Sequence, residues 1–206
     1  MDELLTEEQK LIRNSVREWV KKEVSPIVED ACQKATFPTQ WIKGLAEIGA
    51  FGPYIPQEYG GGGLDQIAYG LIMQELERGD SGLRTFASVQ GSLAMVAIHL
   101  FGSEEQKERW LPAMAQGKKL GCFALTEPEF GSNPGGLRCR AEKTPDGYRL
   151  RGAKKWIGNG TIADVAIVWA KVAGEPGLDS ESADAIRGFL VEKGTPGFSA
   201  TLMEGK

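Results

Sequence analysis

The stretch GKKLGCFALT, residues 117–126, separates two kinds of sequence pattern. On its N-terminal side, apolar residues recur every three or four positions, which is typical of helices that bury one face. On its C-terminal side, short runs rich in valine and aromatic residues alternate with turn residues, which is typical of β-strands. The pattern predicts an α+β protein, with an all-α helical domain over residues 1–118 and an antiparallel, barrel-like β domain over residues 119–206.

Polar residues that precede apolar helical runs mark the expected helix starts. Thr6 and Ser103 are each followed three residues later by a glutamine, which is the spacing of a capping box. Thr39 and Asp65 precede further amphipathic runs and are expected to cap them. The last helix of this part is expected to close near Pro112.

The β domain is expected to begin with a short strand over residues 122–126. Residues 138–143 and 148–156 flank a Pro-Asp-Gly turn at residues 145–147, which predicts a β-hairpin. Further strands are expected over residues 164–172, 187–193 and 198–203.

Charge and composition argue against several classes of function. The chain has 24 Lys and Arg against 28 Asp and Glu, a net charge of −4, whereas a nucleic-acid-binding protein is expected to carry a basic face. The same balance argues against docking on an anionic membrane, and no apolar run approaches the length of a membrane span. Residues 1–8 are acidic, unlike a secretory or transit peptide, so the expected location is the cytoplasm.

The cysteines and the histidine do not have the spacing of metal ligands. Cys32, Cys122 and Cys139 are far apart and His99 is the only histidine, so no metal site is expected. The thiols are expected to be buried, and His99 to pack within a helix, since no partner nucleophile accompanies it.

GNGTIA at residues 158–163 fits the GxGxxA dinucleotide fingerprint. That fingerprint needs a helix next, whereas a strand is expected here, which argues against a Rossmann site.

The segment GCFALTEPEFGSNP, residues 121–134, carries the strongest indication of function. The expected strand ends in a Thr-Glu-Pro turn, and a Gly-Ser-Asn-Pro turn follows, so the loop offers two hydroxyl groups and backbone N–H donors. Glycine permits a ligand to approach the backbone closely, and donors gathered in this way can hold phosphates or the polar edge of a flavin. Spacing alone leaves an ordinary polar surface loop as an alternative.

This segment resembles the flavin-binding signature of the acyl-CoA dehydrogenase family, usually LTEPxxGSD. KWIGN at residues 155–159 is similar to the family's second flavin segment, usually KxWITN. SEEQK at residues 103–107 and WLP at residues 110–112 resemble the segment that precedes the β domain. Several motifs in family order across nearly all 206 residues are more specific than any one of them. The resemblance implies a flavoprotein oxidoreductase that binds FAD and an acyl-CoA.

The resemblance also implies a cofactor site built from both flavin segments. Residues of the first segment line the isoalloxazine ring or reach the ribityl-pyrophosphate region of FAD, and residues of the second segment pack against the ring system. The implied FAD-binding residues are Phe123, Leu125, Thr126, Gly131, Ser132, Trp156, Ile157 and Gly158.

Within the family, the chain looks closest to the glutaryl-CoA dehydrogenases, which implies a substrate site around Arg84. In those enzymes an arginine at this place binds the far carboxylate of the substrate, helped by hydroxyl groups that here belong to Thr85 and Ser88, while Ser132 lies near the acyl-CoA. A guanidinium offers a rigid two-pronged donor to a carboxylate. The implied reaction is α,β-dehydrogenation of glutaryl-CoA with decarboxylation to crotonyl-CoA, in fatty acid and amino acid catabolism.

Two residues depart from the family motifs. Asn133 stands where the family usually has aspartate, a change that can keep a turn or cap role. Gly158 replaces the usual threonine, whose hydroxyl bonds the flavin near N5. Loss of this bond could alter oxygen access, so an acyl-CoA oxidase of the same fold stays an alternative.

The family's catalytic base is a glutamate of a C-terminal helical bundle that the 206 residues do not include. The resemblance therefore implies a base beyond residue 206 and assigns no catalytic residue within the chain. A truncated, non-catalytic interaction module is the alternative of another class. For the complete enzyme, the family implies electron-transfer flavoprotein as the electron acceptor and a homotetramer.

Overall fold

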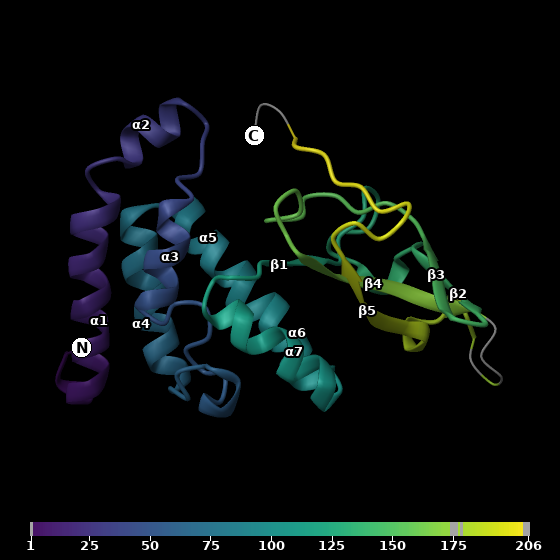
Figure 1. The fold of residues 1–206 in the computed structure, drawn as a ribbon, viewed down its shortest axis with the longest axis horizontal. Coiled ribbons are helices and arrows are strands. Elements are labelled where there is room, and N and C mark those ends of the chain that lie inside the picture. The colour runs from purple at the N-terminus through teal and green to yellow at the C-terminus, as the bar shows by residue number, and fades with distance from the viewer. Residues whose placement is uncertain (1, 174–176, 178, 204–206) are drawn as a thin grey trace. The chain divides into compact units, whose positions relative to one another are not determined.

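The structure of the protein is a computed structural model that describes residues 2–173, 177 and 179–203. The chain forms two compact units, Met1–Leu120 and Gly121–Lys206 (Figure 1). The first is helical and the second is built on a β-sheet, as the two sequence patterns predict.

The helical unit consists of α-helices joined by turns, by a long connection over residues 48–65, and by two π-helical segments, η2 (Val20–Val24) and η4 (Val89–Met95). The α-helices are α1 (Glu7–Trp19), α2 (Val28–Gln33), α3 (Gln40–Glu47), α4 (Gln66–Gly79), α5 (Ser81–Ser88), α6 (Val96–Phe101) and α7 (Glu104–Ala115). Single 3-10 turns lie at η1 (Asp2–Leu4) and η3 (Gln57–Tyr59).

Side chains cap three of the helices at the predicted positions. The Thr6 hydroxyl accepts a hydrogen bond from the N–H of Gln9 at 3.1 Å, and the Ser103 hydroxyl accepts one from the N–H of Gln106 at 3.3 Å. Both glutamine side chains accept a bond from the cap residue in return, so both capping boxes are confirmed. The Asp65 carboxylate caps α4 by accepting from the N–H three residues later, at 2.7 Å.

Other helix boundaries differ from the prediction. Thr39 makes no side-chain capping bond, because its backbone is already helical (φ −63°, ψ −21°) rather than extended. Helix α7 does not close at Pro112 but continues to Ala115. A proline has no N–H to donate, but its carbonyl can still accept a hydrogen bond. The carbonyl of Pro112 accepts one from the N–H of Gln116 at 3.2 Å. Helix α2 was not predicted, and its six residues are too few for a periodic pattern to stand out.

The packing of α1 against α4 encloses a buried charge. Glu75 of α4 is 1% exposed and accepts two hydrogen bonds from Arg17 of α1, at 3.0 and 2.8 Å. These bonds hold the pKa of Glu75 below its usual range, against the effect of burial, so the carboxylate is ionised at neutral pH. The pair therefore ties α1 to the centre of the helical unit.

The β unit holds one five-stranded sheet in its described part: β1 (Gly121–Ala124), β2 (Arg140–Thr144), β3 (Gly147–Arg151), β4 (Val165–Ala173) and β5 (Ile186–Glu192). Strands β2 and β3 form the predicted hairpin, but β3 ends at Arg151, and residues 152–156 are not the continuation of the strand that was predicted. Strand β5 runs antiparallel to β4. However, β4 pairs in parallel with β1 along Val165–Val168 and with β2 along Lys171–Ala173. The sheet is therefore mixed, and the prediction of a purely antiparallel domain is wrong in this respect.

Connection length explains the parallel pairings. A hairpin signal predicts an antiparallel neighbour only where the connection is short, whereas parallel strands need a crossover of a dozen or more residues. Long segments separate β1 from β2 and β3 from β4, so the chain can return in the same direction. Because β5 covers one edge of β4 over Val165–Lys171, β1 and β2 share the opposite edge end to end.

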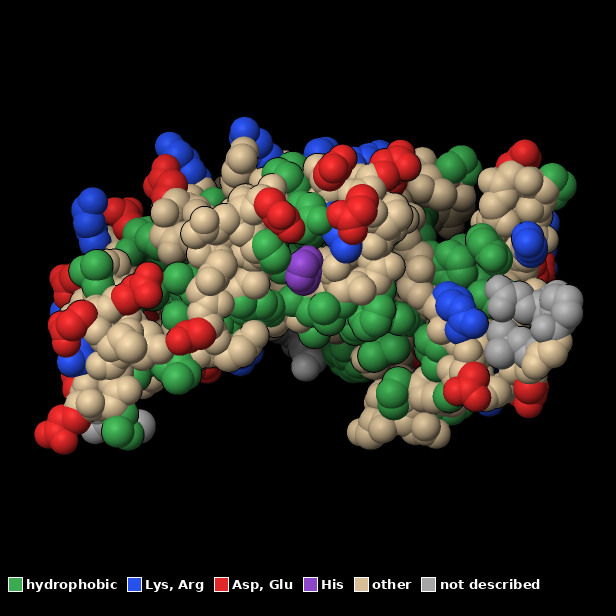
Figure 2. Space-filling model, turned by 90° about the horizontal axis from the view of Figure 1, so that it is seen from below, with side chains coloured by type: hydrophobic (Ala, Val, Ile, Leu, Met, Phe, Trp, Pro, Cys, Tyr) green, Lys and Arg blue, Asp and Glu red, His purple; other side chains and the backbone are tan. Residues whose placement is uncertain are grey.

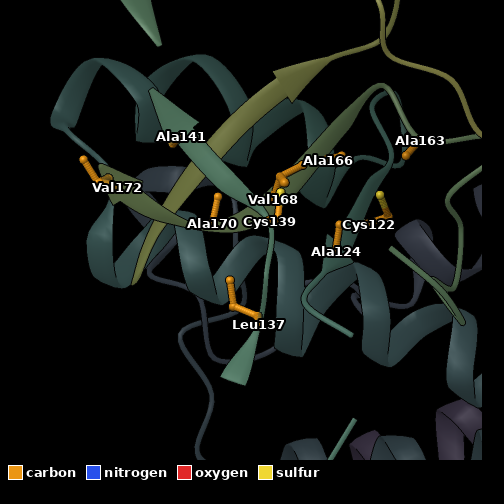
Figure 3. Packing of buried hydrophobic residues seen from close by; sticks show 10 residues of the cluster. All are labelled: Cys122, Ala124, Leu137, Cys139, Ala141, Ala163, Ala166, Val168, Ala170 and Val172. Atoms are coloured by element: carbon orange, nitrogen blue, oxygen red, sulfur yellow. The ribbon is translucent and has the colours of Figure 1, made fainter. Parts of the chain in front are cut away.

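Small and branched side chains from alternate positions form the core of the β unit. Figure 3 shows Cys122 and Ala124 of β1 beside Ala166, Val168 and Ala170 of β4. This period-two pattern is what a strand with one core face produces. The complete buried cluster contains Cys122, Ala124, Leu137, Cys139, Ala141, Ala163, Ala166, Val168, Ala170 and Val172.

Residues 198–203 do not form the predicted strand, and their backbone is irregular. Their alternating pattern would produce a strand only by pairing with a sheet edge, and no strand of the described residues pairs with them. Phe198, Leu202 and Met203 are accordingly exposed, Leu202 to 78%.

Candidate functional site

The fold brings the two segments that resemble flavin-binding motifs side by side. The N–H of Lys155 donates to the carbonyl of Thr126 at 2.9 Å. The ammonium of Lys154 donates to the carbonyl of Leu125 at 3.0 Å. The end of β1 and the segment after β3, far apart in the sequence, thus form one surface of the β unit.

The loop after Glu127 folds back on itself, and the packing of an aromatic ring stabilises it. The backbone groups of Glu127 and Phe130 exchange two hydrogen bonds of 3.1 and 3.3 Å. The Phe130 ring lies so close to Gly136 that a Cβ there would come within 2.4 Å of it, and the Arg138 guanidinium lies 5.4 Å from the ring centre. The loop therefore has a defined shape although it is at the surface.

Gly131 and Ser132 lie on the exposed part of this loop. A Cβ added at Gly131 would meet no atom within 4 Å among the described residues, so the backbone there is open to close approach. The Ser132 hydroxyl lies on the same open stretch.

Trp156 has an unusual backbone and an unusual exposure. Its φ is +64°, in the left-handed region that a bulky residue rarely adopts, and it is 53% exposed. The Lys155 ammonium lies 4.8 Å from the centre of its ring. A large aromatic ring presented to solvent in a constrained conformation is a feature of ligand-binding surfaces.

The residues that follow Trp156 anchor the second segment. Ile157 packs against the core of the β unit, whereas Gly158 is exposed. Asn159 also has a left-handed backbone (φ +64°), which asparagine tolerates better than most residues. Its side-chain amide donates to the carbonyl of Gly121 at 3.4 Å and so ties this segment to the start of β1.

The remaining ring-lining candidates belong to β1 and its end. Phe123 alternates with the core residues Cys122 and Ala124, so its side chain is on the opposite face of the strand, where its ring lies 5.6 Å from that of Trp169. Leu125 instead packs in part against the core cluster.

A buried ion pair that the sequence analysis missed lies beneath these segments. Glu127 and Lys154 are 2.9 Å apart, with side chains 5% and 10% exposed. Burial by itself would raise the pKa of Glu127, but the Lys154 ammonium and the backbone N–H groups of Arg138 and Cys139 hold that pKa below its usual range. The carboxylate is therefore ionised at neutral pH. The signal available in the sequence was a lysine two positions before the motif tryptophan.

The substrate residues that the resemblance implies on the helical unit belong to α5. Arg84 is 37% exposed at its side chain, and its Nε donates to Glu77 of α4 at 2.6 Å. Thr85 is exposed, and the Ser88 hydroxyl donates to the carbonyl of Thr85 at 3.1 Å. The three residues are neighbours on one helix.

The described residues contain no group of three or more His, Cys, Asp or Glu side chains placed to hold a metal ion. The prediction of buried thiols holds for Cys122 and Cys139, where burial raises the pKa, for Cys122 to about 11. It is wrong for Cys32, which is exposed. His99 is on α6, as expected, with its Nδ1 buried and without a hydrogen-bond partner among the described residues.

The surface shows no segregation of charge on the face drawn in Figure 2, where acidic side chains lie among basic ones. Among the described residues, none of the helices combines the length and apolar character needed to cross a membrane.

Comparison with known proteins agrees with this architecture. The model of the acyl-CoA dehydrogenase N-terminal domain matches residues 6–118, and that of the acyl-CoA dehydrogenase middle domain matches residues 122–206. The chain is 40% identical over 202 residues to an acyl-CoA dehydrogenase of Bacillus subtilis (strain 168), covering 98% of this chain and 52% of that protein.

Solved structures of similar proteins match the whole chain. A glutaryl-CoA dehydrogenase from Mycobacterium smegmatis in complex with FADH2 has a TM-score of 0.93 and 45% identity, with 100% of this chain and 50% of that chain covered. A structure described as the electron transferring flavoprotein of Acidaminococcus fermentans has a TM-score of 0.91 and 36% identity, with 100% and 53% covered.

A helical domain followed by a β-sheet domain is the architecture of the acyl-CoA dehydrogenase fold. The chain belongs to the acyl-CoA dehydrogenase family, and it comprises the family's N-terminal and middle domains. It spans about half the length of the relatives that it matches.

Proposed function

We propose that this chain supplies the FAD-binding and part of the substrate-binding machinery of an acyl-CoA dehydrogenase. The observation that carries the proposal is the pairing of the Leu125–Thr126 backbone with Lys154 and Lys155, which joins the segment of the half-exposed Trp156 ring to the segment that continues into the exposed Gly131-Ser132 loop. FADH2 in the Mycobacterium smegmatis structure, 45% identical to this chain, supports FAD as the cofactor.

The residues present suit a flavin nucleotide. An exposed indole ring offers a wall for a planar ring system, and an open glycine with a neighbouring hydroxyl suits a phosphate-bearing tail. Bound FAD would supply the acceptor for the hydride that leaves the β-carbon of the thioester. The residues proposed to hold it are Phe123, Leu125, Thr126, Gly131, Ser132, Trp156, Ile157 and Gly158.

Glutaryl-CoA is the proposed substrate, and Arg84 is the residue proposed to select it. The Arg84 Nε is engaged by Glu77, while its two terminal nitrogens bond to no other described residue. A guanidinium held on one side in this way keeps two parallel donors for a second carboxylate. Thr85 and Ser88 would help to bind that carboxylate, and Ser132 would lie near the acyl chain.

Removal of the α-proton needs a positioned base. We assign that role to none of residues 1–206 and expect a glutamate beyond them, as the family resemblance implies. The proposed products are crotonyl-CoA and carbon dioxide, the proposed electron acceptor is electron-transfer flavoprotein, and the complete enzyme is proposed to be a homotetramer.

One residue favours a second function. Gly158 lacks the hydroxyl that family members usually offer near flavin N5, so an acyl-CoA oxidase is the alternative. The third candidate is a non-catalytic interaction module. If it is right, the reading frame ends after residue 206 and the purified protein carries no flavin.

The test is purification of the enzyme that the complete gene encodes. The proposal requires about one FAD per chain and reduction of an artificial electron acceptor by glutaryl-CoA faster than by butyryl-CoA. Rapid reoxidation of the reduced enzyme by oxygen, with substrate or product bound, would favour the oxidase. A colourless protein that reduces no acceptor would reject both enzymatic functions.

A further inference from the structure

The Glu127 carboxylate is the point at which three segments of the β unit meet. It accepts hydrogen bonds from the backbone N–H groups of Arg138 at 2.6 Å and Cys139 at 2.9 Å. It also accepts one from the Lys154 ammonium at 2.9 Å. Because this side chain is 5% exposed and accepts three charge-assisted hydrogen bonds, it holds the three segments in fixed positions relative to one another.

Lys154 joins the two motif segments directly. Its ammonium bonds both the Glu127 carboxylate and the carbonyl of Leu125, two residues earlier in the first segment. The next residue, Lys155, adds the backbone bond to Thr126. Lys154 and Lys155 thus attach the second segment along Leu125, Thr126 and Glu127 in succession.

Trp156 is the next residue after this attachment. Its left-handed backbone is unfavourable for a bulky side chain and persists only if the surrounding structure imposes it. The bonds of Lys154 and Lys155 fix the chain immediately before Trp156, and the packing of Ile157 against the core fixes the chain immediately after it.

We propose that Glu127 and Lys154 are positioning residues of the flavin site, whose ion pair holds Trp156 in the backbone conformation that presents its ring to the isoalloxazine. This inference rests on the proposed FAD site. Neither residue needs to touch the cofactor, since both act through Trp156 and through the backbone of residues 125–127.

The test uses the enzyme encoded by the complete gene and measures the dissociation constant of FAD and the visible flavin spectrum. Lys154→Met and Glu127→Gln are each expected to raise the Kd for FAD at least tenfold and to change the spectrum. Lys154→Arg, which keeps the charge, is expected to recover part of the affinity.

A double-mutant cycle separates positioning from general destabilisation. If Lys154 acts through Trp156, Lys154→Met should cost much less FAD affinity in a Trp156→Leu background than in the wild type. Lys171→Met is the matched control, because Lys171 is a lysine of the same unit that is 4% exposed and bonds the carbonyl of Glu181 at 2.6 Å. It is expected to lower the melting temperature of the apoprotein and to leave the flavin spectrum unchanged.

Three results would overturn the inference: FAD binding within twofold of wild type in Glu127→Gln and Lys154→Met, equal losses in both tryptophan backgrounds, or the same loss in Lys171→Met. Should Lys154→Met fail to fold, the same comparison is made with Glu127→Gln, which keeps an oxygen for the backbone N–H groups. A wild-type enzyme that binds no FAD would reject the proposed function itself, whereas normal wild-type binding with unaffected variants rejects only this inference.

Discussion

Glu77 and Arg84, seven residues apart, are joined by a hydrogen bond of 2.6 Å from the arginine Nε to the glutamate carboxylate. Ser81 donates to the other carboxylate oxygen, also at 2.6 Å, and the bonds from Ser81 and Arg84 hold the pKa of Glu77 below its usual range. Glu77 is thus a charged group that fixes one side of the guanidinium at neutral pH.

Arg84→Leu is expected to abolish selection of a dicarboxylic substrate. In the complete enzyme, the ratio of kcat/KM for glutaryl-CoA over butyryl-CoA should fall at least about tenfold, because a charge-assisted two-pronged contact is lost. Arg78→Leu, at an exposed arginine of α4, is the control and should leave the ratio unchanged. An unchanged ratio in Arg84→Leu would show that Arg84 does not contact the far end of the substrate.

Trp156→Ala and Ser132→Ala are expected to weaken retention of FAD. Removal of the indole deletes the largest exposed aromatic surface of the second segment, and removal of the serine hydroxyl deletes a polar anchor. Flavin content per chain after gel filtration measures the effect. Tyr148→Ala removes an aromatic side chain of β3 that is 42% exposed and should retain wild-type flavin. Wild-type flavin content and spectra in both site variants would place the cofactor elsewhere.

The 206-residue chain produced by itself is expected to lose FAD readily and to catalyse no dehydrogenation. The physical reasons are that no residue of the chain is assigned as the base for the α-proton, and that the family resemblance implies further FAD contacts from outside these two domains. Dye reduction with glutaryl-CoA and butyryl-CoA, with FAD added, measures the activity. The product of the complete gene serves as the positive control, and turnover by the 206-residue chain above the no-enzyme rate would contradict the expectation.

Glu75→Gln is expected to destabilise the helical unit by about 2 kcal/mol at neutral pH, since it weakens a buried pair of charge-assisted bonds. Because the folded-state pKa of Glu75 is lowered from its ordinary value of 4.5, its contribution is fully present above pH 4.5 and is lost as pH falls through the folded-state pKa.

Urea unfolding measured between neutral pH and pH 3 checks both parts of this expectation. The wild type should lose stability on acidification more steeply than Glu75→Gln. Glu18→Gln, at an ion pair whose glutamate side chain is 69% exposed, is the control and should behave as wild type. If the free energy of unfolding falls equally with pH in wild type and in Glu75→Gln, protonation of Glu75 is not the cause of the lost stability.

Gly91→Ala is expected to lower stability, whereas Gly70→Ala is expected to maintain or raise it. A Cβ at Gly91 in η4 would lie 2.3 Å from the carbonyl oxygen of Phe51, a backbone atom that cannot move alone. A Cβ at Gly70 in α4 would meet nothing within 4 Å, so alanine there gains helix propensity of about 0.5–1 kcal/mol. Thermal unfolding should show a lower midpoint for Gly91→Ala and an equal or higher one for Gly70→Ala. A neutral Gly91→Ala would show that η4 and the Phe51 turn separate easily.

Features that depend on near neighbours in the sequence could be predicted from it. The capping boxes at Thr6 and Ser103, the cap at Asp65 and the β2–β3 hairpin are each set by residues within a few positions of one another. The order of motifs likewise identified the family, since several short patterns at family spacing are more specific than any one pattern.

The tertiary structure decided which distant segments meet. The parallel pairing of β4 with β1 and β2 depends on long connections whose path no local pattern specifies. Glu127 and Lys154 are 27 residues apart, and no local pattern indicates that their side chains meet. They become a buried ion pair only because the sheet brings the end of β1 against the segment after β3. Water is largely excluded there, so a charge without a partner would be unfavourable, and the two side chains must meet in this one arrangement.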